Sequence, residues 1–229
     1  MLNLMEIRSC DELPPAEHLL LQELTHRINN ELASTIGFVR LTAAQSTNNE
    51  VKAVLDRVIQ HINDFARIYR ALQMPVADHW IDAAKYLREL CQSISRAKLQ
   101  HRGIDLVLFE SDLQLSASRC WRLGMIVSEL IANASRHAFG GGGGTIQVEL
   151  LDRDDFVQCT VTDDGTGSHD IRPGQGLRII RSLAGDLHGT IEHYSGKMGT
   201  RTILCFPLHE AGSDGAETTC LSLRDASTG

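Results

Sequence analysis

Residues 123–140, LGMIVSELIANASRHAFG, contain the pattern on which the rest of the fold depends. Their apolar residues recur at about the 3.6-residue period of an α-helix, and these are Met125, Val127, Leu130, Ile131 and Ala134. Four polar residues gather on a roughly common face of the same helix, and these are Glu129, Asn133, Arg136 and His137. Acid, amide and basic groups beside an apolar stripe suit a magnesium–phosphate site, because Mg²⁺ prefers oxygen ligands. Taken alone, the pattern fits a solvated polar face on a core helix equally well.

The composition of the 229-residue chain narrows the class of protein. The formal net charge is −7 and aromatic residues make up 5%, which argues against the basic, ring-bearing surface that binds nucleic acid. No apolar run approaches the roughly 18–20 residues of a membrane span, and no signal peptide is visible. We therefore expect a cytoplasmic protein of one or two domains with a substantial core, and neither a nucleic-acid partner nor a membrane span.

The six cysteines are scattered and include no CxxC pair. They lie mostly in apolar or periodic runs, which is typical of reduced, packed thiols in a cytosolic protein. Their positions are Cys10, Cys91, Cys120, Cys159, Cys205 and Cys220.

Two amphipathic helices are expected before residue 74. The first starts at Pro14–Pro15, since proline is tolerated in a first helical turn, and its stripe holds Leu21, Leu24, Ile28, Leu32, Ile36 and Val39. After the polar turn at 46–49, apolar residues spaced alternately by four and three form a heptad seam: Val51, Leu55, Val58, Ile62, Phe65, Tyr69 and Leu72. One hairpin cannot bury both stripes well, so residues 14–74 are expected to form a dimeric four-helix bundle. A single hairpin docked on the following domain is the alternative.

After a linker at 73–78, residues 79–209 alternate between helix and strand. Helices are expected at 82–99, 123–140 and 176–187, and strands at 104–110, 145–151, 156–162, 190–194 and 201–207. The five-glycine run 140–144 is interpreted as a flexible connection. The order predicts an α+β domain whose helices cover one face of a mixed sheet. Residues 210–229 are small and polar, and we expect them to be disordered.

Three glycine-bearing segments follow the 123–140 helix. In DDGTG, residues 163–167, a carboxylate at a strand end precedes two glycines, so the backbone can approach a planar ligand while the acid accepts a hydrogen bond from an amine. Alone, DDGTG is also a common turn sequence. GQGL, residues 174–177, opens a helix, where free N–H groups and the positive dipole end attract phosphate. Gly199 and Thr200 precede the final strand, and the absence of GxxxxGK[ST] and G-x-G-x-x-G motifs argues against P-loop and Rossmann sites.

Taken in order, ELIANASRHAF, DDGTG, GQGL and the Gly-Thr pair resemble the N-box, DxGxG box, GxGL box and terminal Gly-Thr of the GHKL (Bergerat-fold) ATPases. The resemblance implies a GHKL α/β sandwich with a mixed sheet that binds ATP and Mg²⁺. It implies that Asn133 holds Mg²⁺, that Asp163 reads the adenine amine and that Thr200 supports the adenine side. Glu129 matches the acid that activates the attacking group in some relatives. The remaining implied nucleotide contacts are Gly165 and Gly167 at the base, Gly174, Gly176 and Leu177 at the triphosphate, and Arg136 and His137 near phosphate or ribose.

The segment ELTHRINNELAS, residues 23–34, carries a second resemblance. His26 and Asn30 are four residues apart and so share a helix face. An exposed histidine on a bundle is ordinarily only a surface residue. Here the segment resembles the phosphoacceptor of histidine kinases with the signature His-Arg-hydrophobic-x-Asn-x-Leu, a group related to the HWE kinases, and the match continues through YLRELC and GQGLRIIRSLAGDLHG.

This second resemblance implies a two-component histidine kinase core. His26 would be phosphorylated from Mg-ATP and would pass the phosphoryl group to an aspartate of a response-regulator receiver. Asn30 would orient a water molecule or the receiver's phosphoryl group in the reverse reaction. Since no sensor domain precedes residue 14, a separate sensor partner or the dimer state is expected to regulate the kinase.

Three departures from the family pattern leave alternatives open. The segment 168–173 is shorter than the usual ATP lid, Glu31 stands where relatives carry a second asparagine, and Arg27 replaces the carboxylate that follows the histidine in the commonest kinases. One alternative is a histidine phosphotransferase, a relay with a degenerate ATP-binding domain. The other is a GHKL serine kinase or an ATPase of another class.

Overall fold

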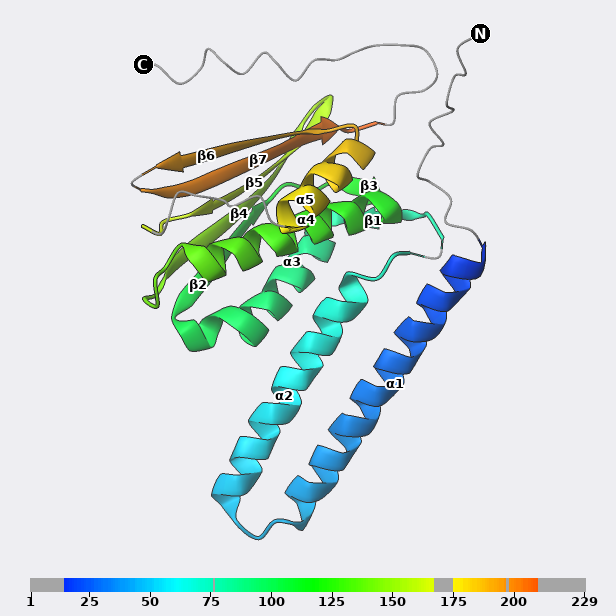
Figure 1. Cartoon of the computed structure of the whole chain (residues 1–229), viewed down its shortest axis with the longest axis vertical. Helices are drawn as coiled ribbons and strands as arrows, with labels where there is room; N and C mark the ends of the chain where they lie inside the picture. Colours follow the sequence, from blue (N-terminus) through cyan, green and yellow to red (C-terminus); the bar gives the residue numbers. More distant parts are fainter. Residues whose placement is uncertain (1–14, 76, 167–174, 197, 210–229) are drawn as a thin grey trace. The chain divides into compact units, whose positions relative to one another are not determined.

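The computed structural model describes residues 15–75, 77–166, 175–196 and 198–209 (Figure 1). The chain divides into two compact units between Ala66 and Arg67. The first is helical and the second combines helices with a mixed sheet, which confirms the predicted α+β class. The predicted domain limits, 14–74 and 79–209, stay a prediction, and the tail at 210–229 lies outside the described residues. None of the described helices combines the length and the apolar character needed to cross a bilayer.

Two helices make up the hairpin at the start of the chain, as the two apolar stripes predict. Helix α1 spans Pro15–Gln45 and helix α2 spans Asn49–Ala71. Asn48 caps α2, because its Oδ1 accepts hydrogen bonds from the N–H groups of Glu50 at 2.8 Å and Val51 at 3.4 Å. The cap satisfies N–H groups that have no partner within the helix and so fixes where α2 begins.

Both helices of the hairpin carry apolar side chains on their surface. On α2, Val51, Val58 and Phe65 of the predicted heptad seam are 43%, 41% and 41% exposed. On α1, Phe38 and Leu41 are 72% and 58% exposed. Part of the seam is therefore available to a further helical partner.

The second unit contains a five-stranded sheet in the order β2-β4-β5-β7-β6. The strands are β2 Ile104–Glu110, β4 Gly144–Arg153, β5 Phe156–Asp163, β6 Thr190–Gly196 and β7 Gly199–Pro207. Only β2 and β4 are parallel, so the sheet is mixed as predicted. One face is covered by three helices, α3 Ala83–Ile94, α4 Ala117–His137 and α5 Gln175–Asp186 (Figure 1).

Several element boundaries differ from the prediction. The helix expected at 82–99 ends at Ile94 and continues as a π-helical turn, Ser95–Leu99, and a 3₁₀ turn, Gln100–Arg102. The helix expected at 123–140 begins earlier, at Ala117, and ends at His137. A small antiparallel pair, β1 Trp80–Asp82 and β3 Gln114–Ser116, was not anticipated, because three-residue strands are too short to show an alternating pattern.

Helix α4 is fixed in the core by its apolar face. Leu123, Ile126 and Ile131 are 0% exposed, and they pack with side chains of the sheet such as Ile146 and Leu150. Each such burial contributes roughly 1.5–3 kcal/mol relative to an exposed side chain. The opposite, polar face of α4 is consequently held in one orientation.

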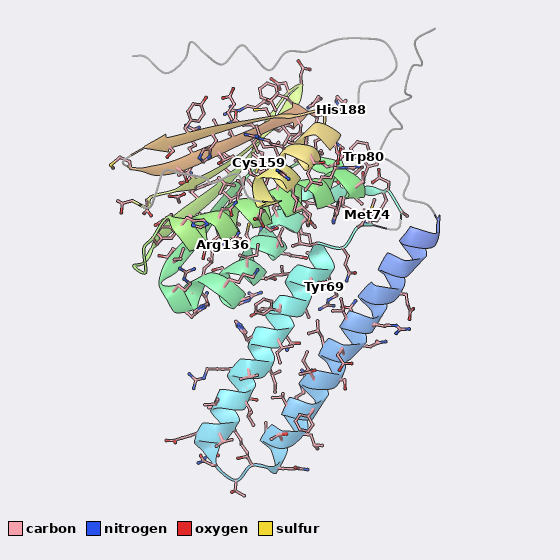
Figure 2. All side chains as sticks on the ribbon, in the orientation of Figure 1. Tyr69, Met74, Trp80, Arg136, Cys159 and His188 are labelled. Carbon is pink, nitrogen blue, oxygen red and sulfur yellow. The ribbon has the colours of Figure 1, made fainter. Side chains whose placement is uncertain are left out.

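The described cysteines confirm the prediction of packed thiols. Cys91, Cys120, Cys159 and Cys205 are free and buried, and Cys159 lies in the second unit as labelled in Figure 2. Burial raises the pKa of the Cys91 and Cys120 thiols to about 12, which keeps them protonated. The predictions for Cys10 and Cys220 fall outside the described residues.

Candidate functional site

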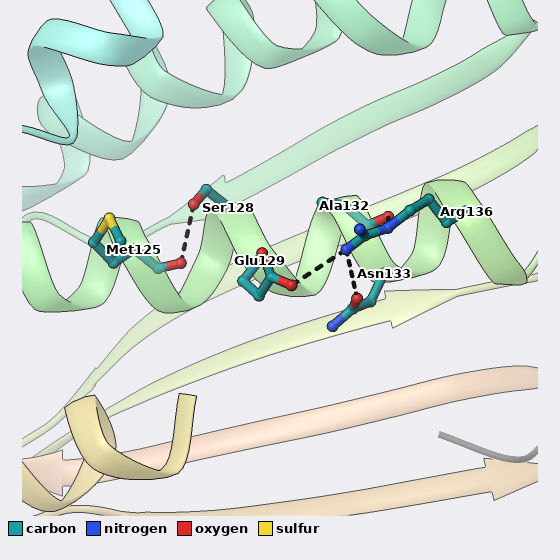
Figure 3. Close-up of polar contacts among 6 residues, drawn as sticks. All are labelled: Met125, Ser128, Glu129, Ala132, Asn133 and Arg136. Atoms are coloured by element: carbon teal, nitrogen blue, oxygen red, sulfur yellow. Dashed lines mark hydrogen bonds and ion pairs between the residues drawn. The ribbon is translucent and has the colours of Figure 1, made fainter. Parts of the chain in front are cut away.

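Three of the predicted residues meet on the polar face of α4 (Figure 3). Arg136 Nη2 donates a hydrogen bond to Asn133 Oδ1 at 2.9 Å and lies 3.2 Å from Glu129 Oε1. Arg136 Nε also donates to the Ala132 carbonyl oxygen at 3.1 Å, which holds the guanidinium along the helix. One cationic nitrogen therefore contacts both the amide and the carboxylate oxygen that the sequence assigns to metal and catalysis.

The exposure of this cluster limits its contribution to stability. The side chains of Arg136 and Glu129 are 56% and 32% exposed. Exposed ion pairs of this kind contribute about 0–1 kcal/mol because water and salt screen them. The cluster is therefore easily rearranged.

The oxygens of Asn133 and Glu129 fit a magnesium ion. Mg²⁺ prefers oxygen ligands and usually takes only one or two from the protein, with water and substrate phosphates completing its shell. The part of the chain that is described contains no group of three or more His, Cys, Asp and Glu side chains able to hold a metal.

A buried carboxylate forms the second part of the site. Asp163, at the end of β5, is 4% exposed and pairs in register with Thr200 of β7. The Thr200 hydroxyl donates to Asp163 Oδ2, while the N–H groups of Thr200 and Gly165 donate to Oδ1 at 3.3 and 3.1 Å. Three donors thus satisfy and orient the carboxylate. The bonds from Thr200 connect residues that are 37 positions apart in the sequence.

The second aspartate of DDGTG has a structural contact. Asp164 Oδ1 accepts a hydrogen bond from the Thr145 N–H at 2.7 Å, and the Asp164 N–H donates to the Thr145 carbonyl at 3.2 Å. These bonds fasten the segment to the start of β4. The sequence alone did not distinguish the contacts of the two aspartates.

Two glycines allow the DDGTG and GQGL segments to lie close to α4. A Cβ at Gly165 would lie 2.3 Å from the carbonyl oxygen of Ala138, just beyond α4. A Cβ at Gly176, in the first turn of α5, would lie 2.2 Å from Glu129 Oε1. Both segments therefore pack closely against α4. A side chain at Gly165 would meet backbone atoms, whereas one at Gly176 would meet only the movable end of the Glu129 side chain.

The remaining predicted nucleotide contacts are only partly described. Leu177 is half-buried in the first turn of α5, and His137 is exposed in the last turn of α4. Gly167, Gly174 and the proposed lid at 168–173 lie outside the described residues. For Leu177 and His137, the described contacts include none that tests the predicted role.

The predicted phosphoacceptor segment is helical. His26 and Asn30 lie in α1, four residues apart along one uninterrupted helix, but the side chain of His26 lies outside the described part of the chain. Asn30 and Glu31 are exposed, and Arg27 Nε lies 2.8 Å from Glu23 Oε1.

His193 of β6 was not among the predicted site residues. Its Nδ1 lies 2.8 Å from Thr202 Oγ1, on the strand that also carries Thr200. Burial lowers the pKa of His193 and the nearby Asp163 carboxylate acts in the opposite sense. No sequence signal marks this histidine, since it occupies an ordinary strand position.

A groove of about 400 Å³ lies between α3 and β2. Arg88 and Arg96 line it together with Glu110, and Arg88 Nε donates to Glu110 Oε1 at 2.6 Å. None of the predicted site residues lines this groove.

Two protein-family models match the chain. The model described as "Histidine kinase" matches residues 23–98, and the model described as "Histidine kinase-like ATPase domain" matches residues 82–206, more than half of the chain.

Curated relatives carry related descriptions. Sensor histidine kinase PdtaS of Mycobacterium tuberculosis is 27% identical over 223 residues, which cover 90% of this chain and 43% of the relative. Blue-light-activated histidine kinase 2 of Erythrobacter litoralis is 25% identical over 202 residues, covering 83% of this chain and 57% of the relative. The chain thus spans about half the length of the curated relatives it matches.

Solved structures share the fold. The histidine kinase domain of the Erythrobacter litoralis EL346 blue-light activated kinase matches with a TM-score of 0.55 at 23% identity, covering 82% of this chain and 93% of that one. Acinetobacter baumannii histidine kinase AdeS matches with a TM-score of 0.50 at 13% identity, covering 82% of this chain and 98% of that one. At these identities the likeness extends to the fold alone.

Proposed function

Because the chain belongs to the histidine kinase family, we propose that it transfers the γ-phosphoryl group of ATP to His26 and then to an aspartate of a response-regulator receiver. The observation that carries the proposal is the cluster on α4, where the side-chain oxygens of Asn133 and Glu129 both contact one cationic group, the Arg136 guanidinium. ATP and Mg²⁺ are the proposed cofactors.

On the nucleotide side, the protein groups orient the ligand. The carboxylate of Asp163, fixed by Thr200 and Gly165, is suited to accept a hydrogen bond from the adenine amine. Asn133 would hold Mg²⁺, which when bound neutralises phosphate charge. The first turn of α5, at Gly176 and Leu177, offers backbone N–H groups to phosphate.

On the acceptor side, His26 acts as the nucleophile. A neutral imidazole nitrogen forms the new bond to the γ-phosphorus as the bond from phosphorus to the β–γ bridging oxygen breaks, so ADP leaves with that electron pair. Imidazole needs no prior deprotonation near neutral pH, because its unperturbed pKa is about 6.5. Its N–H proton is released afterwards. Glu129 is proposed as the acidic residue that activates the attacking group. Asn30 orients the receiver's phosphoryl group or a water molecule in the reverse reaction.

The hairpin supplies the partner surface. Exposed apolar residues on both helices, Phe38 and Leu41 on α1 and the Val51–Phe65 seam on α2, support a homodimer formed through residues 14–74. We further propose a cytoplasmic location.

Calorimetric titration with the non-hydrolysable nucleotide AMPPNP and Mg²⁺ tests the nucleotide half of the proposal. The wild-type chain should bind, and Asn133→Ala should bind at least about tenfold more weakly, the loss expected for a ligand contact to a charged group. The exposed substitution Gln60→Ala on α2 is the control and should bind as wild type.

Two other outcomes would point to other functions. No nucleotide binding, together with exchange of phosphoryl groups between receivers through His26, would favour the relay phosphotransferase. Nucleotide binding and protein phosphorylation that survive His26→Ala would favour a GHKL serine kinase or another ATPase.

A further inference from the structure

We propose that the Arg136 guanidinium occupies the Mg²⁺ position while the metal is absent and is displaced when the metal binds. The guanidinium and Mg²⁺ compete for the same oxygens of Asn133 and Glu129, and the arginine that the metal displaces moves to the nucleotide phosphates. This inference rests on the proposed function, because it concerns the metal and nucleotide of that same site.

The geometry makes the two cations mutually exclusive. Arg136 Nη2 lies 2.9 Å from Asn133 Oδ1 and 3.2 Å from Glu129 Oε1. A magnesium ion binds an oxygen ligand at about 2.0–2.1 Å and demands near-octahedral geometry. A guanidinium hydrogen-bonded to those two oxygens therefore stands where the ion and its shell must go.

The exchange is feasible because the arginine is weakly held. Its side chain is 56% exposed, and exposed ion pairs contribute little to stability. The guanidinium carries five N–H donors, a fork that matches phosphate oxygens. Release from Asn133 therefore frees a group suited to phosphate binding.

The destination of the released arginine adjoins its starting point. Glu129 Oε1, the oxygen that Arg136 contacts, lies against the backbone of α5, since a Cβ at Gly176 would be 2.2 Å from it. The first turn of a helix carries backbone N–H groups without partners inside the helix, and phosphate commonly binds there. Arg136, Glu129 and the start of α5 thus form one continuous set of contacts.

A purely structural role for Arg136 makes a different prediction. Arg136 would then only join α4 residues three, four and seven positions earlier, and its removal would alter stability without altering metal affinity. Mn²⁺ binding to the full chain, followed by the electron paramagnetic resonance signal of free Mn²⁺, separates the two cases without any turnover.

In the absence of nucleotide, Arg136→Met should bind Mn²⁺ at least about fivefold more tightly than wild type. Removing one positive charge close to the metal changes its affinity by about that factor even at the dielectric constant of water. Arg153→Met removes the same charge from the far end of β4 and should leave Mn²⁺ affinity unchanged. Arg136→Gln serves as a second neutral variant if the methionine variant melts early.

A double-mutant cycle distinguishes competition from long-range charge. If Arg136 occupies the metal position, its effect should shrink in an Asn133→Ala background, where the shared oxygen is missing. Unchanged or weaker Mn²⁺ binding in both neutral variants would overturn the exchange, as would an equal gain in Arg153→Met or an undiminished gain in the Asn133→Ala background.

Nucleotide titrations test the second half of the exchange. Arg136→Met should bind Mg²⁺–AMPPNP several-fold more weakly and adenosine as well as wild type, because only the phosphates lose a contact. Equal affinity for Mg²⁺–AMPPNP in wild type and variant would overturn the move to phosphate. If the wild-type chain binds no nucleotide at all, the proposed function fails first, which is a distinct result.

Discussion

At the scale of single residues, the two neighbouring aspartates of DDGTG are held in different ways. Asp163 is 4% exposed and receives hydrogen bonds from Thr200 and Gly165, whereas Asp164 bonds the backbone of Thr145. The first carboxylate is built into the candidate site, and the second fastens the loop to the sheet.

Asp163→Asn should weaken ATP binding by about tenfold or more, because it removes a charged acceptor worth roughly 1.5–3 kcal/mol. Asp164→Asn is the matched control and should lower the free energy of unfolding while leaving ATP affinity nearly unchanged. Calorimetric titration and urea unfolding of both variants provide the comparison. The reverse pattern, with ATP binding lost only in Asp164→Asn, would contradict the assignment.

The sequence identified Asp163 and Thr200 as site candidates but not the bond between them. That bond follows from the register of β5 and β7, which places the two residues opposite each other. Register depends on the hydrophobic pattern and the turn together, and here the connection between the strands includes a helix. His193 was missed for a related reason, since only the neighbouring strand gives it a polar environment.

At the scale of elements, the packing of α5 on α4 brings the GQGL motif at the start of α5 next to the ELIANASRHAF motif on α4. Gly176 abuts Glu129, and the apolar side of both helices belongs to one core with members such as Ile131 and Ile180. The start of α5 and the polar face of α4 are thereby fixed side by side.

Gly176→Ala should reduce nucleotide affinity with little loss of stability. The added Cβ meets only the flexible end of Glu129, which can move aside but then leaves its place beside Arg136. Gly185→Ala, on the same helix, has open space and should raise the free energy of unfolding by about 0.5–1 kcal/mol through helix propensity, with unchanged nucleotide affinity.

Thermal unfolding and AMPPNP titration of the two variants provide the readout. Equal nucleotide affinity in both would show that the contact between Gly176 and Glu129 has no role in the site.

Helix and strand positions were largely predictable, whereas some boundaries were not. Apolar periodicity located the five sheet strands and the five α-helices of the described residues. The early start of α4 depends on a distant group: Asp78 Oδ1 accepts a hydrogen bond from the Ser118 N–H at 2.9 Å, forty positions along the chain. A cap supplied by tertiary structure leaves no local sequence signal.

At the scale of the whole molecule, the hairpin has more apolar surface than a single copy covers. Val58 is 41% exposed in the middle of the α2 seam, and Phe38 of α1 is 72% exposed. A second copy of the hairpin would bury these side chains in a four-helix bundle. The sequence predicted the seam from its heptad spacing, but spacing alone does not identify the partner.

Val58→Glu should shift the chain from dimer to monomer at micromolar concentration, because a charge in a bundle core is not paired. Gln60→Glu introduces the same charge at an exposed position outside the seam and should leave the dimer intact. Light scattering after size exclusion measures both. A monomeric wild-type chain would contradict the dimer and favour the single hairpin.

The most direct test of the whole account is the transfer of label from γ-labelled ATP, with Mg²⁺, to the purified chain. The account predicts an acid-labile, alkali-stable label on the wild type and on His61→Ala, a second histidine of the hairpin, but none on His26→Ala or Asn133→Ala. Label that persists in His26→Ala, or a wild-type chain that binds Mg-ATP yet never becomes labelled, would contradict it.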